Sequence, residues 1–182
     1  SFGASVKTCP SNAFTVCTRF HTMDQVLHKM MKESDNLYAE SMYYQIAAST
    51  GNRPASAKSA RNVERQLIRK IGLDPSRYKL ADGSGLSLYN YLSAELEVKL
   101  LRYAYLNDNI MDHLKQSLPI AGVDGTLKKR MKGSFTHGNV KAKTGTLTGI
   151  ISLAGYCKAA NGHDVCFSII NNGIMHGSNA RN

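Results

Sequence analysis

The sequence predicts an α+β fold in which helices flank an antiparallel sheet. Apolar residues recur at helical spacing in several segments of the region from about 22 to 118. The region from about 139 to 173 instead holds three segments of strand-like composition. Asn161-Gly162, between the last two of these segments, is a strong signal for a hairpin turn. A helical part therefore precedes a sheet whose strands run antiparallel.

The composition is that of one globular domain. The chain has 182 residues, 42% of them hydrophobic and 20% charged, which permits a real core and is not typical of a disordered segment. Its apolar stretches are far shorter than the ~20 residues that a membrane span needs. The net charge of +10 favours anionic partners. The densest basic cluster, 127–133, has no aromatic neighbours for base stacking, so we interpret it as a solvated face and expect no nucleic acid partner.

The helical part begins with a capping box. Thr22 and Gln25 have the spacing of this motif, and we expect a helix from there to about Glu33. The apolar face of this helix comprises Met23, Val26, Leu27, Met30 and Met31. Before it, residues 15–20 (TVCTRF) are a candidate for a short strand.

Four further helices follow. They are expected at about 37–48, at about 57–71 with Gly72 as the stop, near 92–106 and near 109–116. The inner stripe of the second helix comprises Tyr38, Met42 and Ile46. The corresponding face of the third comprises Val63, Leu67 and Ile71.

The hairpin raises the question of a disulfide. If Asn161 and Gly162 are the two loop residues, Cys157 and Cys166 lie opposite one another in a non-hydrogen-bonded pair, where side chains approach most closely. They then form either a disulfide or a pair of buried thiols, and a longer loop would shift the register. No C-x-x-C pair and no histidine at zinc-finger spacing occurs, so we expect neither a metal site nor a cofactor.

The stretch KAKTGTLTG (141–149) carries the most informative chemistry. Lys143 supplies a positive charge, and Thr144 and Thr146 supply hydroxyl donors. Gly145 has no side chain to block a ligand that lies along the strand. Such a strand can bind a carboxylate beside a reacting carbonyl, and its free edge can pair with an extended peptide. Taken alone, the triplet is weak evidence and favours an ordinary strand with a glycine irregularity.

A second motif, Ser34-Asp35-Asn36, lies upstream at a helix end. Its serine can relay a proton, and its asparagine can hold a carbonyl through the side-chain amide. The two motifs stand in the order found in active-site serine penicillin-binding proteins and class A β-lactamases. SDNLYAE, LADGSGLS, GVDGTLKKRMKG, VKAKTGTLTGIISLAGY and FSIINNG together resemble the D-alanyl-D-alanine carboxypeptidase/endopeptidase family of class C low-molecular-mass penicillin-binding proteins. The resemblance covers about Thr22 to Gly173.

The resemblance implies a serine penicillin-binding protein/β-lactamase-like fold, of which residues 1–182 form a C-terminal, partial domain. It also implies an enzyme of the periplasm or extracytoplasmic cell surface that cuts peptidoglycan peptides ending in D-Ala-D-Ala and is acylated by β-lactam antibiotics. Carried over by position, the catalytic residues are Ser34, Asn36 and Lys143, and the substrate-binding residues are Thr144, Gly145 and Thr146. The backbone N–H of Thr146 would be an oxyanion-hole donor. Leu88 departs from the family, which has a basic residue there.

The nucleophile of the resembled family is the serine of an S-x-x-K motif. The only match in this chain, Ser76-Arg77-Tyr78-Lys79, follows the Ser34 motif, whereas the nucleophile should precede it. We therefore expect the attacking serine to lie outside these residues, and the chain to hold two walls of a cleft and to be inactive alone.

Two alternatives stay open. A class A-like β-lactamase shares both motifs but needs a deacylating glutamate, in an E-x-x-x-N setting. None of Glu64, Glu95 and Glu97 is followed by asparagine four residues on. The other alternative is a non-catalytic cell-wall-binding fragment that uses the same cleft.

Overall fold

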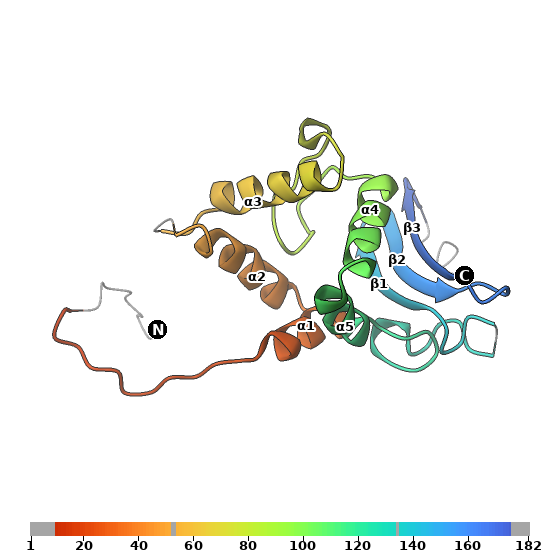
Figure 1. Cartoon of the computed structure of the whole chain (residues 1–182), viewed down its shortest axis with the longest axis horizontal. Coiled ribbons are helices and arrows are strands. Elements are labelled where there is room, and N and C mark those ends of the chain that lie inside the picture. The colour runs from red at the N-terminus through yellow and green to blue at the C-terminus, as the bar shows by residue number, and fades with distance from the viewer. Residues whose placement is uncertain (1–9, 52–53, 134, 176–182) are drawn as a thin grey trace.

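Helices precede a small antiparallel sheet, so the predicted α+β class is confirmed. The computed structural model describes residues 10–51, 54–133 and 135–175. Its helices are α1 (Met23–Lys32), α2 (Asn36–Ala48), α3 (Ala57–Lys70), α4 (Ala94–Tyr105) and α5 (Asp108–Ser117). Its strands are β1 (Lys141–Leu147), β2 (Ile150–Lys158) and β3 (Asp164–Asn172), and its 3-10 turns are η1 (Pro75–Arg77) and η2 (Gly125–Leu127). In Figure 1, α4 lies against the sheet, whereas α2 and α3 pack on each other farther from it.

The helices begin where the sequence predicts, because local capping groups fix their first turns. Gln25 N–H donates to Thr22 Oγ1 (3.2 Å) and Thr22 N–H donates to Gln25 Oε1 (3.0 Å), so the predicted capping box is confirmed. The side chains of Asp35, Ser56 and Ser93 are single N-caps of α2, α3 and α4, each accepting from the backbone N–H three residues on. All five predicted helices are confirmed.

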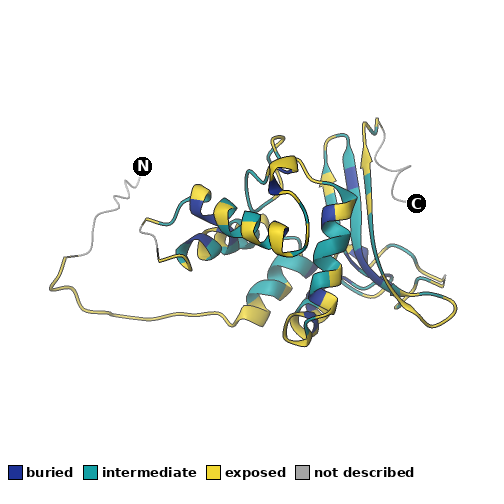
Figure 2. Ribbon diagram, turned by 45° about the horizontal axis from the view of Figure 1, so that its top comes forward, coloured by how far each residue is buried: buried dark blue, intermediate teal, exposed yellow. Residues whose placement is uncertain are grey.

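The strand expected at residues 15–20 is wrong. This segment has no regular secondary structure, and Phe14, Val16 and Phe20 are each more than 80% exposed. Figure 2 shows the described part of the segment before α1, residues 10–22, as exposed. No described strand pairs with it, and strand-type residues do not form a stable strand without a partner.

The predicted inner stripe of α2 is also wrong, by one residue. The side chains that α2 buries are Tyr43 and Ala47, which pack with Ala60 of α3. The Tyr43 hydroxyl also donates to Ala57 O (3.1 Å). In α3 the buried apolar residues are Ala60 and Ile68, whereas the predicted Leu67 is only partly buried. The contacts between the two helices determine which face of each helix is buried, and the sequence of either helix alone does not predict these contacts.

The sheet has the order β1-β2-β3 with both pairs antiparallel, so the three predicted strands are confirmed. One face packs on α4 and α5 through Tyr156 and Cys166. The opposite face carries Ala142, Cys157 and Phe167, which pack against a second apolar cluster around η2. Lys143 pairs with Ala154 of β2 and therefore lies on the same face as Tyr156.

The predicted hairpin register is wrong, again by one residue. Tyr156 pairs with Cys166 and Cys157 pairs with Val165, so the two cysteines lie on opposite faces of the sheet. The cause is a three-residue loop, closed by Ala159 N–H donating to His163 O (2.9 Å), in which Gly162 has a φ of 84°. Both thiols are free, and the possible Cys157–Cys166 disulfide is excluded.

Candidate active site

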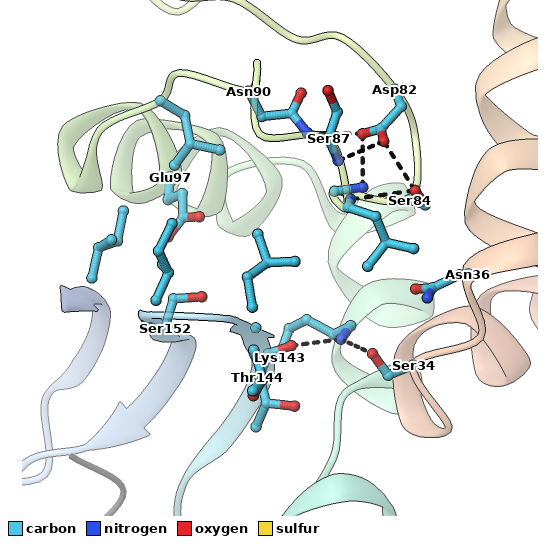
Figure 3. A pocket seen from close by; sticks show the side chains of 18 of the residues that line it. Ser34, Asn36, Asp82, Ser84, Ser87, Asn90, Glu97, Lys143, Thr144 and Ser152 are labelled. Atoms are coloured by element: carbon cyan, nitrogen blue, oxygen red, sulfur yellow. Dashed lines mark hydrogen bonds between the residues drawn. The ribbon is translucent and has the colours of Figure 1, made fainter. Parts of the chain in front are cut away.

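A cavity of about 1020 Å³ lies between the α1–α2 joint, β1 and the loop before α4 (Figure 3). We refer to it as the cleft. All six residues predicted from the two motifs line it: Ser34, Asn36, Lys143, Thr144, Gly145 and Thr146. Two segments more than a hundred residues apart in sequence therefore meet at one surface.

Ser34 occupies a strained position in the joint between α1 and α2. Its φ is 58°, in the left-handed region that residues other than glycine seldom adopt. Asp35 then begins α2 by accepting from Tyr38 N–H (3.1 Å). Strain of this kind persists only where the surroundings enforce it. Here the turn directs the Ser34 hydroxyl toward β1, and Asn36 points into the cleft from the first turn of α2.

The side chain of Lys143 joins the two motifs. Its ammonium donates to Ser34 Oγ (2.6 Å) and to Thr144 O (2.7 Å), as Figure 3 shows. No described carboxylate forms an ion pair with it. Burial lowers the pKa of Lys143 below its ordinary value of 10.5, because desolvation disfavours the charged form. The result is a lysine that carries its charge without a counter-ion and gives up its proton more readily than a surface lysine.

An ion pair between a buried lysine and a partly exposed aspartate supports this geometry. Lys32, the last residue of α1, is 6% exposed, and its ammonium donates to the carboxylate of Asp124. Asp124 also accepts from Ile120 N–H (2.8 Å). Two residues further on, Thr126 shares a hydrogen bond with Thr144 (2.8 Å between their hydroxyl oxygens). The end of α1 and the strand β1 are therefore fixed to the same turn. Sequence reasoning gave no role to Lys32, Asp124 or Thr126, although the last two lie in the family-like block GVDGTLKKRMKG.

One edge of β1 is open to the cleft. Ala142 N–H donates to Pro119 O (3.0 Å), but no described strand pairs with this edge beyond it. A Cβ on Gly145 would lie 2.3 Å from Ser152 Oγ, so this position cannot carry a side chain without displacing Ser152. The backbone from Lys143 to Thr146 can therefore accept an extended ligand, in agreement with the chemistry expected of the motif.

The opposite wall is a loop organised by two carboxylates. Asp82 accepts from Gly85 N–H (2.9 Å), Ser87 N–H (2.9 Å) and Asn90 Nδ2 (2.8 Å). Burial opposes the charge of Asp82, but these hydrogen bonds outweigh it and lower the pKa of the carboxyl group. Glu40 of α2 holds the same loop by accepting from Gly83 N–H (2.9 Å). Sequence reasoning identified this loop as family-like but missed both carboxylates that shape it.

Leu88, which stands where the family resemblance predicts a basic residue, makes part of this wall apolar. Leu88 is 76% exposed and Leu86 is 52% exposed, and both line the cleft. Ser76, by contrast, does not line the cleft. It is exposed in η1, and its hydroxyl donates to Asp74 Oδ2 (2.7 Å). The structure thus agrees with the inference that Ser76 is not the nucleophile.

Two further carboxyl groups at the cleft were not predicted as site residues. Burial raises the pKa of Glu64 to about 7, although attraction to Arg61 opposes the shift. Burial likewise raises the pKa of Glu97, which accepts from Ser168 Oγ (2.5 Å). Within the described residues no group of side chains has the make-up of a metal site, and no helix is long and apolar enough to cross a membrane.

The fold and the paired motifs define the class: a serine penicillin-binding protein/β-lactamase-like domain. The model of the D-Ala-D-Ala carboxypeptidase 3 (S13) family matches residues 10–182, and the chain belongs to this family. The predicted family resemblance is thereby confirmed.

Relatives of known name agree with this placement. The chain is 37% identical over 157 residues to D-alanyl-D-alanine carboxypeptidase DacB of Haemophilus influenzae, covering 85% of this chain and 33% of that protein. It is 36% identical over 156 residues to D-alanyl-D-alanine carboxypeptidase of Actinomadura sp., covering 83% of this chain and 28% of that protein. The chain thus spans about a third of the length of the curated relatives that it matches.

Solved structures show the same relationship. Penicillin-binding protein 4 (dacB) of Haemophilus influenzae superposes with a TM-score of 0.78 at 37% identity, over 84% of this chain and 34% of that one. The same protein has been solved in complex with a β-lactam. The TLA-3 extended-spectrum β-lactamase, at 19% identity and a TM-score of 0.63, covers 88% of this chain and 59% of its own and shares the fold alone.

Proposed function

We propose that the protein is a serine-type D-Ala-D-Ala carboxypeptidase/endopeptidase that acts on peptidoglycan peptides through an acyl-enzyme and binds β-lactams. The contact between Lys143 Nζ and Ser34 Oγ, at 2.6 Å in the cleft, carries this proposal. It joins a proton-relaying hydroxyl to a desolvated ammonium, which is the pairing that acyl transfer by a serine needs. The known activities of similar family members support the same reaction.

Each predicted residue has a role in this reaction. Ser34 passes a proton to the leaving group, and Asn36 holds the substrate amide. Lys143 sets the positive potential of the site, and the hydroxyl groups of Thr144 and Thr146 receive the terminal carboxylate. The backbone N–H of Thr146, on the open edge of β1, donates to the developing oxyanion. Gly145 lets the peptide lie against the strand.

The attacking serine comes, in this proposal, from a part of the protein outside residues 1–182, because Ser76 lies away from the cleft. The chain by itself then provides walls of a cleft without the nucleophile. Its substrate, a peptidoglycan peptide ending in D-Ala-D-Ala, places the protein in the periplasm or at the extracytoplasmic cell surface.

Covalent labelling of the full-length protein by a fluorescent penicillin tests the proposal. We expect one label per molecule, and we expect Lys143→Ala to slow labelling about 100-fold or more, as the loss of an electrostatic catalytic group does. Lys158→Ala is the matched control, since it removes the same charge from an exposed residue of β2 and should label at the wild-type rate. Equal labelling rates for wild type and Lys143→Ala would remove Lys143 from the site.

Two further measurements separate the alternatives. Rapid turnover of nitrocefin by the full-length protein would indicate a β-lactamase, with Glu64 or Glu97 as the candidate deacylating group at the cleft. Stoichiometric labelling of the 182-residue chain alone would show that it contains its own nucleophile. Retention of that chain on peptidoglycan without any labelling would support a binding role for the isolated fragment.

A further inference from the structure

A second cavity, of about 380 Å³, adjoins the cleft on the other side of Glu64 and Leu80, which line both spaces. It lies between α3 and the segment that follows η1. Its volume falls within the range of small-ligand sites and suits a ligand the size of one or two amino acids. None of the catalytic roles proposed above uses it. We refer to it as the α3 pocket.

Three cationic side chains and one carboxyl group, that of Glu64, line the α3 pocket. Arg61 and Arg65 of α3 and Lys79 of the facing segment all line it. No ion pair joins any of the three to a carboxylate within 4.0 Å among the described residues. Arg65 donates to Pro75 O (3.2 Å), and the Lys79 ammonium lies 5.0 Å from the centre of the Tyr89 ring, so both are positioned without being neutralised.

Two buried polar atoms in the wall have no partner. Tyr78, which is 8% exposed, lines the pocket, and its buried hydroxyl makes no hydrogen bond among the described residues. Glu64 Oε2 is buried and unpaired in the same way. A buried polar group without a partner destabilises the folded state, so native structures rarely retain one unless a ligand or water completes it.

The two unpartnered atoms differ in the kind of hydrogen-bonding group that would complete them. The Tyr78 hydroxyl can donate to an anionic oxygen, as can the guanidinium groups of Arg61 and Arg65. The ionised Glu64 carboxylate instead accepts from an N–H group. Ile68, Pro75 and Leu80 supply an apolar floor between these polar walls. The complementary ligand therefore has a carboxylate, a neighbouring N–H and a short apolar body.

We propose that the α3 pocket binds an α-amino or α-amido carboxylate, that is, a free amino acid or the end of a peptide, as a site separate from the cleft. The carboxylate binds Tyr78 and the arginines, and the adjacent N–H donates to Glu64. The proposal does not depend on the acyl-enzyme function, because none of Tyr78, Arg61 and Arg65 lines the cleft.

Isothermal titration calorimetry of the full-length protein tests this with three probes: D-alanine, N-acetyl-D-alanine and propionate. Binding of D-alanine and N-acetyl-D-alanine that is tighter than binding of propionate supports the site. If D-alanine binds more tightly than N-acetyl-D-alanine, the ligand is a free amino acid. If N-acetyl-D-alanine binds more tightly, the ligand is the end of a peptide. Tyr78→Phe should weaken binding about tenfold, as the loss of a hydrogen bond to a charged group does. Glu64→Gln should reduce the advantage of the N–H probes over propionate. Binding of propionate as tight as that of both N–H probes would overturn the role of Glu64.

Matched controls keep the test decisive. Tyr78→Phe removes a hydroxyl that has no partner in the described parts of the chain, so the variant should fold at least as well as wild type. Arg61→Gln should weaken binding, whereas Arg69→Gln, which removes the same charge from an exposed residue of the same helix outside the pocket, should not. Unchanged affinity in Tyr78→Phe, or equal losses in the two arginine variants, would overturn the proposal. Labelling of Tyr78→Phe by penicillin at the wild-type rate would show separately that the cleft is intact.

Discussion

Replacing Asp124 by asparagine is expected to destabilise the protein by about 2–4 kcal/mol, somewhat less than for a fully buried pair because Asp124 is 38% exposed, although the two side chains have nearly the same shape. Asparagine retains an oxygen that can accept from Ile120 N–H, so the local turn keeps its hydrogen bond. What disappears is the negative charge that compensates Lys32. The ammonium of Lys32 would stay in the protein interior without its counter-ion, because its side chain is only 8% exposed.

The magnitude follows from the contrast between two ion pairs of the same helix. The Lys32 side chain is 8% exposed and the Asp124 side chain 38%, so removing the carboxylate leaves an uncompensated charge on the buried partner. Lys29 pairs with Glu33 one turn apart, but these side chains are 40% and 53% exposed. Glu33→Gln should therefore change the free energy of unfolding by no more than about 0.5 kcal/mol. For a domain of this size, the Asp124 change corresponds to a fall of about 10 °C in the melting temperature.

Urea denaturation and thermal melting of the two variants provide the assay, with wild type measured alongside. The double variant Lys32→Met/Asp124→Asn completes the test, because it removes the buried charge together with its partner and should recover part of the lost stability. A loss below about 1 kcal/mol for Asp124→Asn would show that Lys32 is solvated, and the reasoning from burial would fail. Losses of equal size for Asp124→Asn and Glu33→Gln would refute it as well.

Three further predictions concern other parts of the molecule. Burial raises the pKa of Glu64 from 4.5 to about 7, so the folded state binds the proton more tightly. Its contribution to stability is complete below pH 4.5 and falls by about 1–2 kcal/mol as the pH rises through 7, once solvent screening of this partly exposed group is allowed for. Urea midpoints of Glu64→Gln should lack this fall, and identical pH profiles would contradict it. A Cβ at Gly155 would lie 2.1 Å from Lys141 O, so Gly155→Ala should destabilise by about 1–3 kcal/mol; an unchanged urea midpoint would refute this. Peptide mapping after alkylation without reductant should find Cys157 and Cys166 both alkylated, whereas a disulfide-linked peptide would contradict the register.

The features that the sequence predicted correctly depend on short stretches of chain. The first helix follows from Thr22 and Gln25, three residues apart, whose side chains cap it whatever lies elsewhere. The strands follow from composition and from the turn at Asn161-Gly162. The residues of the cleft could be predicted because the two motifs identify the family. Neither motif predicts the contact between Lys143 and Ser34.

The features that the sequence did not predict depend on contacts between distant segments. The hairpin register changed because the loop takes in Ala160 as well, and a change of one residue moves Cys157 to the opposite face from Cys166. The inner face of α2 is set by its packing on α3. The ion pair between Lys32 and Asp124 joins residues 92 positions apart, so no local pattern could indicate it.

The environment of Lys143 links the stability of this protein to its proposed chemistry. Its half-buried ammonium has a hydroxyl and a carbonyl as partners but no described carboxylate, so the free cleft retains a desolvation penalty that an ion pair would offset. Hydrophobic packing alone would favour an apolar residue at this position. In the proposed function, a ligand carboxylate such as the end of a peptide or the acid group of a penicillin would supply the missing counter-charge. Because the ion pair at Lys32 and the turn at Ser34 fix the ammonium in advance, ligand binding does not have to order it, and the unfavourable charge of the free cleft strengthens binding of the anion.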